Sequence, residues 1–339
     1  MELTRLRKFL LIASVLLVLA VVVGITRTIG WRPFLGPKAR PLTARRFEST
    51  PQRLERGRYL ATSLMGCLDC HSQRDWDKHG APVVPGTEGG GAEFPIKGLP
   101  GRVAAPNITP DPETGAGIWT DDQLARAIRE GISHDGDTIF PIMPYTEFRS
   151  MSDEDLASIV VYIRTLQPIS HAVPPSDIAF PVKYLIRSAP EPVTAPVASP
   201  DPSNRVAWGK YLATLGGCVG CHTPSVHGQP IAGAEFSGGP LFEGPWGSAA
   251  AANLTPDASG IGYYDEALFI QTIRTGYVKA RKLSSIMPFG TYKNLTDDDL
   301  KALYAYLRTL KPVKHTVDNS EPPTFCKFCQ GNHGGGDKN

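Results

Sequence analysis

One stretch of sequence occurs twice in this chain, and this repeat constrains the fold more than any other feature. The segment Arg56-Gly-Arg-Tyr-Leu-Ala-Thr62 returns as Trp208-Gly-Lys-Tyr-Leu-Ala-Thr214, and both copies lead within a few residues into Cys-x-x-Cys-His. Downstream, the copies stay aligned at an Asn-x-Thr-Pro-Asp segment and at an Ile-Met-Pro-aromatic segment. Because self-similarity over a long period marks duplicated structural units, we predict two copies of one domain.

Each copy is predicted to fold as a few short helices joined by Gly- and Pro-rich loops. In the first copy, the middle helix opens at Thr120 with Gln123 three residues later, a capping-box pattern, and closes at Gly131. The last helix starts at Ser152 and stops before Pro168, which lacks a backbone donor. The second copy repeats these signals, so the expected fold class is all-α.

The two Cys-x-x-Cys-His motifs carry the chemistry. Two cysteines separated by two residues reach the two vinyl groups of one porphyrin, and the adjacent histidine faces the iron from the same side. A thioredoxin-type disulfide would need a βαβ context, which is absent, and a zinc site would need two further ligands per pair. We therefore predict two covalently bound haems c, with these attachment residues and proximal ligands: Cys67, Cys70 and His71 in the first copy, and Cys218, Cys221 and His222 in the second.

One methionine in each copy is the candidate for the second axial position of the iron. Met143 and Met287 stand in the same Ile-Met-Pro-aromatic context, and their paired placement favours a ligand over a core residue that fills a gap. His79 and His134 compete for this position at the first haem, but neither has a counterpart in the second copy. An iron with His and Met bound has no open position for substrate, so electron transfer is favoured over catalysis.

The N-terminal segment indicates membrane targeting. Three basic residues precede an apolar run of 17 residues from Phe9 to Ile25, which is typical of a signal anchor or a signal peptide. No small-x-small cleavage site follows, so a retained transmembrane helix is favoured. More basic residues follow the run than precede it, which by itself would keep the domains inside. Haem attachment requires export, so we expect the domains on the periplasmic side of the cell inner membrane.

Net charge and proline content indicate the kind of partner and the domain division of this chain. The formal net charge of +2 comes from the first eight residues, so nothing indicates nucleic acid or another strongly charged partner. Residues 169–204 contain eight prolines and little periodicity, which predicts an extended connector, although Phe180–Ile186 is apolar enough to lie along a domain surface. The predicted division is an anchor at 1–30, a linker at 31–49, a first domain at 50–168, the connector at 169–204, a second domain at 205–315 and a tail at 316–339.

The tail copies the haem spacing without the ligand. Cys326 and Cys329 are two residues apart, but Gln330 stands where a histidine would be, which disfavours a third haem. In an oxidising compartment the first expectation is a small disulfide or a reactive pair. The alternative is a metal hook of Cys326, Cys329 and His333 that takes a fourth ligand from elsewhere. Three further histidines are interpreted as ordinary surface or satisfied residues: His171, His227 and His315.

Several segments beyond the haem motifs resemble known cytochromes. A glycine in the first helix and a tyrosine in the last helix of each copy look like the contact where the terminal helices of cytochrome c domains cross. These residues are Gly57 and Tyr162 in the first copy, and Gly209 and Tyr306 in the second. The resemblance implies two tandem class I cytochrome c domains after an N-terminal transmembrane helix.

A closer resemblance covers about residues 50–315. Asn107–Gly115, Ile142–Tyr145 and Met151–Leu166 resemble segments of the cytochrome c subunits of membrane-bound alcohol, aldehyde and gluconate dehydrogenases. Those subunits typically carry three haem domains, whereas this chain has two. The resemblance implies passage of electrons from a periplasmic donor, such as a dehydrogenase, to a respiratory acceptor such as quinone or an oxidase.

Two other functions remain open. One is a dihaem redox enzyme of the peroxidase or thiosulfate-oxidising type, in which one haem is catalytic. The other is a structural component of a respiratory assembly whose haems serve only as relays. The methionine in both copies, together with the lack of an evident acid/base cluster beside either motif, favours the electron carrier.

Overall fold

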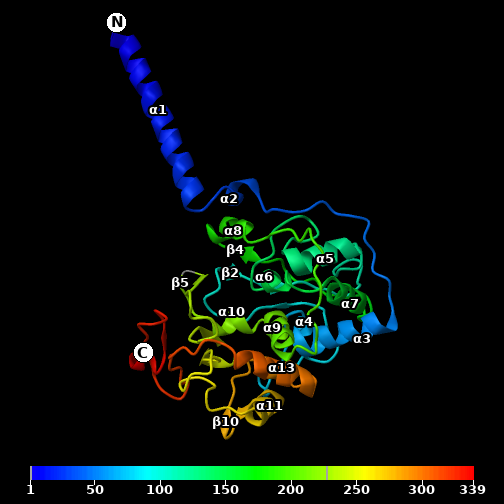
Figure 1. The fold of residues 1–339 in the computed structure, drawn as a ribbon. Helices are drawn as coiled ribbons and strands as arrows, with labels where there is room; N and C mark the ends of the chain where they lie inside the picture. The colour runs from blue at the N-terminus through cyan, green and yellow to red at the C-terminus, as the bar shows by residue number, and fades with distance from the viewer. Residues whose placement is uncertain (1, 227) are drawn as a thin grey trace.

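A single long helix stands apart from the remainder of the molecule. In the computed structural model, which describes residues 2–226 and 228–339, α1 (Glu2–Arg27) projects away from the other elements (Figure 1). Its Arg5–Arg27 portion is long and apolar enough to cross a membrane, and none of it is buried. Both a membrane anchor and a signal sequence have these properties.

The first repeat is built on two crossed helices. α3 (Pro51–Tyr59) continues into the π-helical turn η1 (Leu60–Leu64), and α7 (Asp153–Ile163) packs across α3. A Cβ at Gly57 would lie 1.9 Å from the carbonyl oxygen of Ser158, so no other residue lets the two backbones approach this closely. Three shorter helices complete this group: α4 (Cys67–Cys70), α5 (Asp121–Glu130) and α6 (Tyr145–Phe148).

The second repeat has the same arrangement. α9 (Arg205–Leu215) crosses α13 (Asp297–Leu307), and a Cβ at Gly209 would lie 1.9 Å from the carbonyl oxygen of Ala302. The glycine contact predicted for both copies is therefore confirmed. Its smaller helices are α10 (Cys218–His222), α11 (Glu266–Thr275) and α12 (Phe289–Tyr292).

The capping signals also correspond to real helix ends. Thr120 and Gln123 form a reciprocal capping box at the start of α5, and Gly131 ends that helix with a φ of 71°. In the second repeat, Asp265 caps α11 by accepting the N–H of Leu268, and Gly276 ends the helix with a φ of 72°. Only glycine adopts this left-handed conformation without steric cost.

Short strands occupy the loops, so the all-α prediction is correct for the core and wrong for the connections. Glycine and proline keep these loops out of helices, and hairpin pairing then satisfies their backbone groups. The part of the chain that the structure describes contains six antiparallel pairs. They are β1 (Ala92–Glu93) with β3 (Ala104–Ala105), β2 (Gly101–Arg102) with β4 (Asp177–Ile178), β5 (Ser225–Val226) with β6 (Gln229–Pro230), β7 (Leu241–Gly244) with β8 (Gly247–Ala250), β9 (Tyr277–Val278) with β10 (Arg281–Lys282), and β11 (Pro323–Phe325) with β12 (Asn332–Gly334).

The two repeats pack against each other through a continuous apolar core. In addition, one tyrosine of each repeat forms a hydrogen bond to an aspartate of the other. Tyr59 of α3 donates its hydroxyl to Asp299 Oδ2 at 2.5 Å, and Tyr211 of α9 donates to Asp155 Oδ2 at 2.7 Å. Each hydroxyl also accepts the N–H of the N-cap residue of the opposite last helix, at 3.1 and 3.0 Å. The contact is reciprocal, as expected for duplicated units related by an approximate twofold axis.

The predicted linker at 31–49 is fastened to the first repeat. Arg40 Nη2 lies 2.7 Å from Asp122 Oδ1, and its Nε lies 2.8 Å from Glu130 Oε1, both on α5. The backbone N–H of Thr43 donates to Asp122 as well, at 2.7 Å. Burial raises the pKa of Asp122, but the bonds from Arg40 and Thr43 outweigh it and lower that pKa to about 2. We call residues 31–49 the strap.

The connector at 169–204 differs from its prediction at the apolar segment. α8 (Val182–Leu185) and the 3-10 turn η2 (Ile186–Ser188) pack against α2 (Arg32–Leu35) instead of lying along a domain surface. Because α2 is only one turn long, it leaves much of the segment uncovered, and Phe180 is 83% exposed.

Candidate haem-binding sites

The first Cys-x-x-Cys-His motif forms a tight helical turn. Gly66, with a φ of 60°, turns the chain into α4, and His71 follows directly at the end of the turn. His71 Nδ1 lies 2.7 Å from the carbonyl oxygen of Pro106. A carbonyl only accepts, so Nδ1 carries the proton and Nε2 keeps its lone pair for a metal. Burial lowers the pKa of His71, which also favours the neutral ligand form.

The second motif reproduces this geometry. Gly217, with a φ of 66°, opens α10, and His222 Nδ1 lies 2.7 Å from the carbonyl oxygen of Ala252. In both copies the carbonyl oxygen of the histidine accepts a loop N–H at 2.7 Å, from Gly91 and from Gly238. The two histidines are therefore oriented by the same pair of bonds.

The two candidate methionines occupy matching turns. The carbonyl oxygen of Met143 accepts the N–H of Tyr145, and that of Met287 accepts the N–H of Phe289, both at 2.8 Å. The two aromatic rings pack against the glycines that end α5 and α11, where an added Cβ would lie 2.5 and 2.4 Å from the rings. Both methionines are half-buried against the apolar core.

The two motifs open onto one cavity of about 1730 Å³, far larger than ordinary small-molecule pockets. Residues from both motifs and one candidate axial ligand line it: Cys70, Cys218, Cys221, His222 and Met287. All four motif thiols are free. Free thiols, an available imidazole Nε2 and a cavity of this size suit two covalently attached haems.

The cavity lies between the repeats, and direct bonds cross beside it. Thr291 Oγ1 of α12 donates to Asp69 Oδ2 of α4 at 2.6 Å, and the backbone N–H of Gly80 donates to Ser285 Oγ at 3.1 Å. These bonds join the loop that carries Met287 to the first motif. The geometry of each site therefore depends on the other repeat.

His79 and His134, the alternative candidates for the axial position, both pack against aromatic rings. His79 lies against Tyr277 and Phe289 of the second repeat, with ring centroids 5.0 and 4.5 Å apart. His134 stacks on Trp119 at 4.4 Å. Among the described residues, neither arrangement has an equivalent around the second motif.

The tail residues come together, with one that the sequence interpretation missed. Cys326, Cys329 and His333 are buried, and His315 joins them with an exposure of 0%. The interpretation of His315 as an ordinary surface or satisfied residue did not anticipate this group: the residue is buried, not at the surface, although its Nδ1 is satisfied by the carbonyl oxygen of Ser237. His171, its counterpart in the first repeat, is half-buried and its Nδ1 lies 2.8 Å from the carbonyl oxygen of Gly90. His227 lies outside the described residues.

A repeat-based signal could have revealed His315. In both copies a histidine stands three residues after the proline that follows the last helix, at Pro168 and Pro312. Only the second copy is followed by a Cys-x-x-Cys tail. The combination points to a fourth ligand, although neither part does so alone.

A helical turn that offers two thiols and one oriented imidazole to a large cavity defines a c-type haem-binding domain. Residues 206–311 match the cytochrome c family, so the second repeat is a cytochrome c domain. The resemblance to cytochrome c predicted from the sequence is thus confirmed for the second repeat.

Longer similarities extend over both repeats. The chain is 29% identical over 300 residues to the cytochrome c subunit of a quinone-dependent alcohol dehydrogenase from Gluconacetobacter polyoxogenes, covering 82% of this chain and 61% of that protein. It is 31% identical over 284 residues to the gluconate 2-dehydrogenase cytochrome c subunit of Pantoea cypripedii, covering 78% and 61%. The chain therefore spans about three fifths of the length of these relatives.

A further relative is of similar size to this chain. The dihaem cytochrome c-type protein of Cereibacter sphaeroides is 29% identical over 260 residues, which cover 74% of this chain and 83% of that protein. These three relatives are thus cytochromes c, and two of them are subunits of dehydrogenases.

Proposed function

We propose that this chain is a membrane-anchored dihaem cytochrome c that transfers electrons between a periplasmic donor and a respiratory acceptor. One observation carries the proposal: two copies of the same Cys-x-x-Cys-His turn, each with an oriented histidine, open onto one cavity. Haem bound there supplies a one-electron couple at iron. Two such centres beside one cavity form a path for electrons rather than a pocket for a substrate.

The protein's own residues have three roles in this proposal. The cysteine thiols of each motif attach the porphyrin, and His71 and His222 present Nε2 to its iron because a carbonyl holds Nδ1. Met143 and Met287 would be the second ligands of the two irons, and with both ligands bound each iron would have no open position for substrate or water. Thioether ligands favour the ferrous state, so both centres would have higher reduction potentials than bis-histidine centres.

The interface makes the proposed domains 50–168 and 205–315 one electron-transfer unit. The reciprocal tyrosine bonds and the Thr291–Asp69 bond tie together the elements that carry the two motifs. Because these bonds are partly or fully buried, they resist changes in the relative position of the sites. A fixed separation supports electron transfer between the haems without domain motion.

The exposed aromatic residues next to α1 support the membrane anchor. Trp31, Phe34, Phe180 and Tyr184 are 39 to 83% exposed, on or beside α2 and α8, which lie near the C-terminal end of α1 (Figure 1). Aromatic side chains of this kind concentrate where a membrane meets water. We place α1 in the cell inner membrane, with the haem domains on the periplasmic side and this aromatic group at the membrane surface.

The names of the relatives support a dehydrogenase as the donor. Alcohol and gluconate dehydrogenases are the enzymes to which two of the similar cytochromes belong as subunits. We propose that a periplasmic dehydrogenase subunit delivers electrons to this chain, which passes them on to quinone or an oxidase. Purification of the full chain with a stoichiometric dehydrogenase subunit would support the proposal, and a monomeric preparation that no dehydrogenase reduces would contradict it.

Exchange of each candidate axial ligand tests the electron-carrier proposal. Met143→Leu and Met287→Leu keep the side-chain volume but remove the sulfur, so each should open one iron. We expect each variant to lose the sulfur-to-iron charge-transfer band of one haem in the near-infrared spectrum and to bind carbon monoxide at one haem. Met151→Leu, in the core of the first repeat, is the matched control and should change neither property.

The outcome separates a carrier from an enzyme. Two low-spin haems in the unaltered protein, each opened by only one of the two variants, agree with the proposal. A high-spin haem in the unaltered protein would indicate an open iron and favour a catalytic haem. If neither substitution opened an iron, the axial assignment would be wrong.

A further inference from the structure

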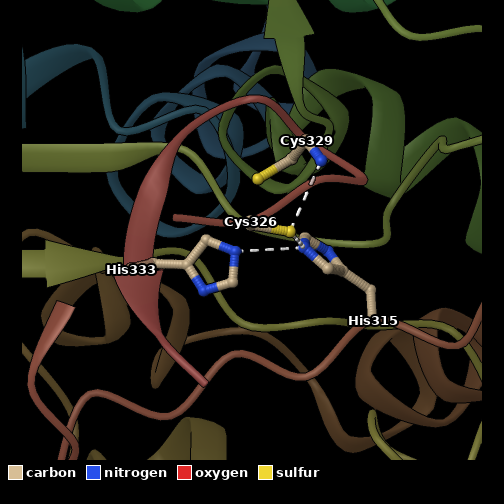
Figure 2. A group of neighbouring side chains, drawn as sticks. All are labelled: His315, Cys326, Cys329 and His333. Carbon is tan, nitrogen blue, oxygen red and sulfur yellow. Dashed lines mark hydrogen bonds between the residues drawn. The ribbon is translucent and has the colours of Figure 1, made fainter. Parts of the chain in front are cut away.

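Four buried side chains meet where the tail covers the second repeat. His315 lies just after α13, while Cys326, Cys329 and His333 come from the hairpin of β11 and β12 and its turn. One ligand-type atom from each residue lies within 4.8 Å of the others, and Figure 2 shows the side chains converging. This site is separate from both haem motifs and plays no part in the proposed electron transfer.

Hydrogen bonds at Nδ1 orient His315 and His333 so that their Nε2 atoms face each other. His315 Nδ1 lies 2.8 Å from the carbonyl oxygen of Ser237, and His333 Nδ1 lies 3.0 Å from that of Gly334. Carbonyls only accept, so both Nδ1 atoms carry protons, and Nε2 is the atom of each ring that can bind a metal. These two Nε2 atoms lie 3.1 Å apart. Two lone pairs at this distance repel each other unless a proton or a metal ion lies between them.

The thiols also have the surroundings of metal-bound thiolates. Cys326 Sγ lies 3.4 Å from His315 Nε2, and two N–H groups donate to this sulfur at 3.5 Å, from the Cys329 backbone and the Asn339 side chain. Donors aimed at sulfur stabilise negative charge on it. Two thiolates and two neutral imidazoles balance one divalent cation, so the filled site would be buried without net charge.

The spacing suits a small tetrahedral metal ion. Zinc binds sulfur at about 2.3 Å and imidazole nitrogen at about 2.0 Å, which places tetrahedral ligand atoms about 3.3 to 3.8 Å from each other. The measured separations of 3.1 and 3.4 Å are close to this range. Two sulfurs and two nitrogens in tetrahedral array are typical of zinc, and four protein ligands leave no position for a substrate.

The local backbone supports these ligand positions. The N–H of Gln330 donates to the carbonyl oxygen of Cys326 at 2.9 Å, and the N–H of Cys326 donates to that of Gly331 at 2.8 Å, closing the turn between the two cysteines. Gly239 makes room beside the cluster, because a Cβ there would lie 2.7 Å from His315 Cε1 and 3.3 Å from Cys329 Sγ. The second repeat thus has a recess shaped for the cluster.

We propose that His315, Cys326, Cys329 and His333 bind one zinc ion that fastens the C-terminal tail to the second repeat. Binding releases one proton from each cysteine, and the metal–ligand bonds replace the missing apolar core of this short tail. The site also reaches the haem region through the Ser237 carbonyl, because the N–H of the next residue, Gly238, donates to the carbonyl oxygen of His222. Zinc would hold this loop in place without touching the haem.

The first repeat provides an internal control. His171 has the same place in its repeat as His315, and its Nδ1 also faces a loop carbonyl, that of Gly90, at 2.8 Å. The segment that follows it, residues 172–217, contains no cysteine. Both repeats therefore have an oriented histidine at this position. Only in the second repeat does the tail provide the three other proposed ligands.

Metal analysis of the untagged, haem-loaded full chain tests the site. We expect about one zinc for every two haem irons, with zinc-edge X-ray absorption showing two sulfurs near 2.3 Å and two nitrogens near 2.0 Å. Cys329→Ser and His315→Ala should each reduce the zinc content to near zero, whereas the matched variant His171→Ala should keep it unchanged. Both haem spectra should be preserved in all variants that fold.

Three outcomes would overturn the proposal. One is a zinc-free protein with a Cys326–Cys329 disulfide, detected by mass spectrometry before and after reduction. Another is zinc without sulfur ligands, and the third is a different metal at this site. Because the unaltered protein alone decides these outcomes, a variant that fails to fold does not obscure the answer.

Discussion

The two repeats share an internal scaffold but differ in what covers them. Both have a glycine at the helix crossing, an oriented motif histidine and a tyrosine bonded across the interface. The first repeat is covered by the strap, which bonds to α5, and the second by the tail, which meets His315. The duplicated part therefore carries the candidate haem-binding motifs, and segments outside the duplication contact each copy separately.

Corresponding positions show how the repeats diverged. Asp122, the second residue of α5, holds the strap through Arg40, whereas the corresponding second residue of α11 is Ala267. Conversely, His315 is grouped with two cysteines, while among the described residues no such group forms around His171. The two repeats have equivalent folds, but Asp122 binds the strap to the first repeat, and the cysteine pair of the tail lies against the second.

The largest effect should come from filling the helix crossings. Gly57→Ala and Gly209→Ala each place a methyl group 1.9 Å from a carbonyl oxygen of the facing helix, so the helices must separate. We expect each to reduce the free energy of unfolding by about 3 kcal/mol, measured by denaturant titration. The exposed neighbour Lys210→Ala should change it by less than about 0.5 kcal/mol. A large effect in one repeat only would show that the crossings are not equivalent.

Removal of the α5 carboxylate that binds the strap should have the next largest effect. The pKa of Asp122 is about 2 in the folded protein, below its ordinary value of 3.8, so its charged form stabilises the fold. Asp122→Asn should cost about 2 kcal/mol at neutral pH. This difference should shrink as the pH falls from about 4 to about 2, because the unaltered protein then loses the same charge.

Stability measured across this pH range checks the prediction. The exposed Asp177→Asn is the control and should follow the unaltered protein. A difference between Asp122→Asn and the unaltered protein that stayed constant down to pH 2 would mean that the ion pair with Arg40 is not the cause.

The smallest effect should come from the reciprocal tyrosines. Tyr59→Phe and Tyr211→Phe each remove a hydroxyl that donates to an aspartate and accepts a backbone N–H. We expect each to cost about 1 kcal/mol, with Tyr211 the larger because it is only 7% exposed. Tyr263→Phe, at an exposed ring, should be neutral. Equal melting temperatures for all three variants would argue against a role of these bonds in joining the repeats.

Local patterns predicted most of the scaffold. The capping box at Thr120, the glycine ends of α5 and α11, and the motif turns depend on residues within one or two turns of each other. The crossing at Gly57 was also predicted, because the pattern occurs twice. The strands were missed, since pairs of two to four residues have no detectable periodicity.

Long-range partners could not be predicted in this way. Arg40 and Asp122 are separated by 82 residues, and His315 Nδ1 meets a carbonyl 78 residues earlier. Neither partner belongs to a recognisable pattern at its own position. Likewise, the apolar segment at 180–186 gave no indication that it would pack against α2 instead of a domain surface.

The amino-acid sequence by itself determined the duplicated helical scaffold, the two haem-attachment turns and the apolar N-terminal helix, because short-range geometry and hydrophobic periodicity specify them. Tertiary structure alone decided that both motifs share one cavity, that the strap grips Asp122, and that His315 completes the tail cluster. These features depend on packing distant segments together. The free energy of that packing is spread over the whole core and is not encoded in any local pattern.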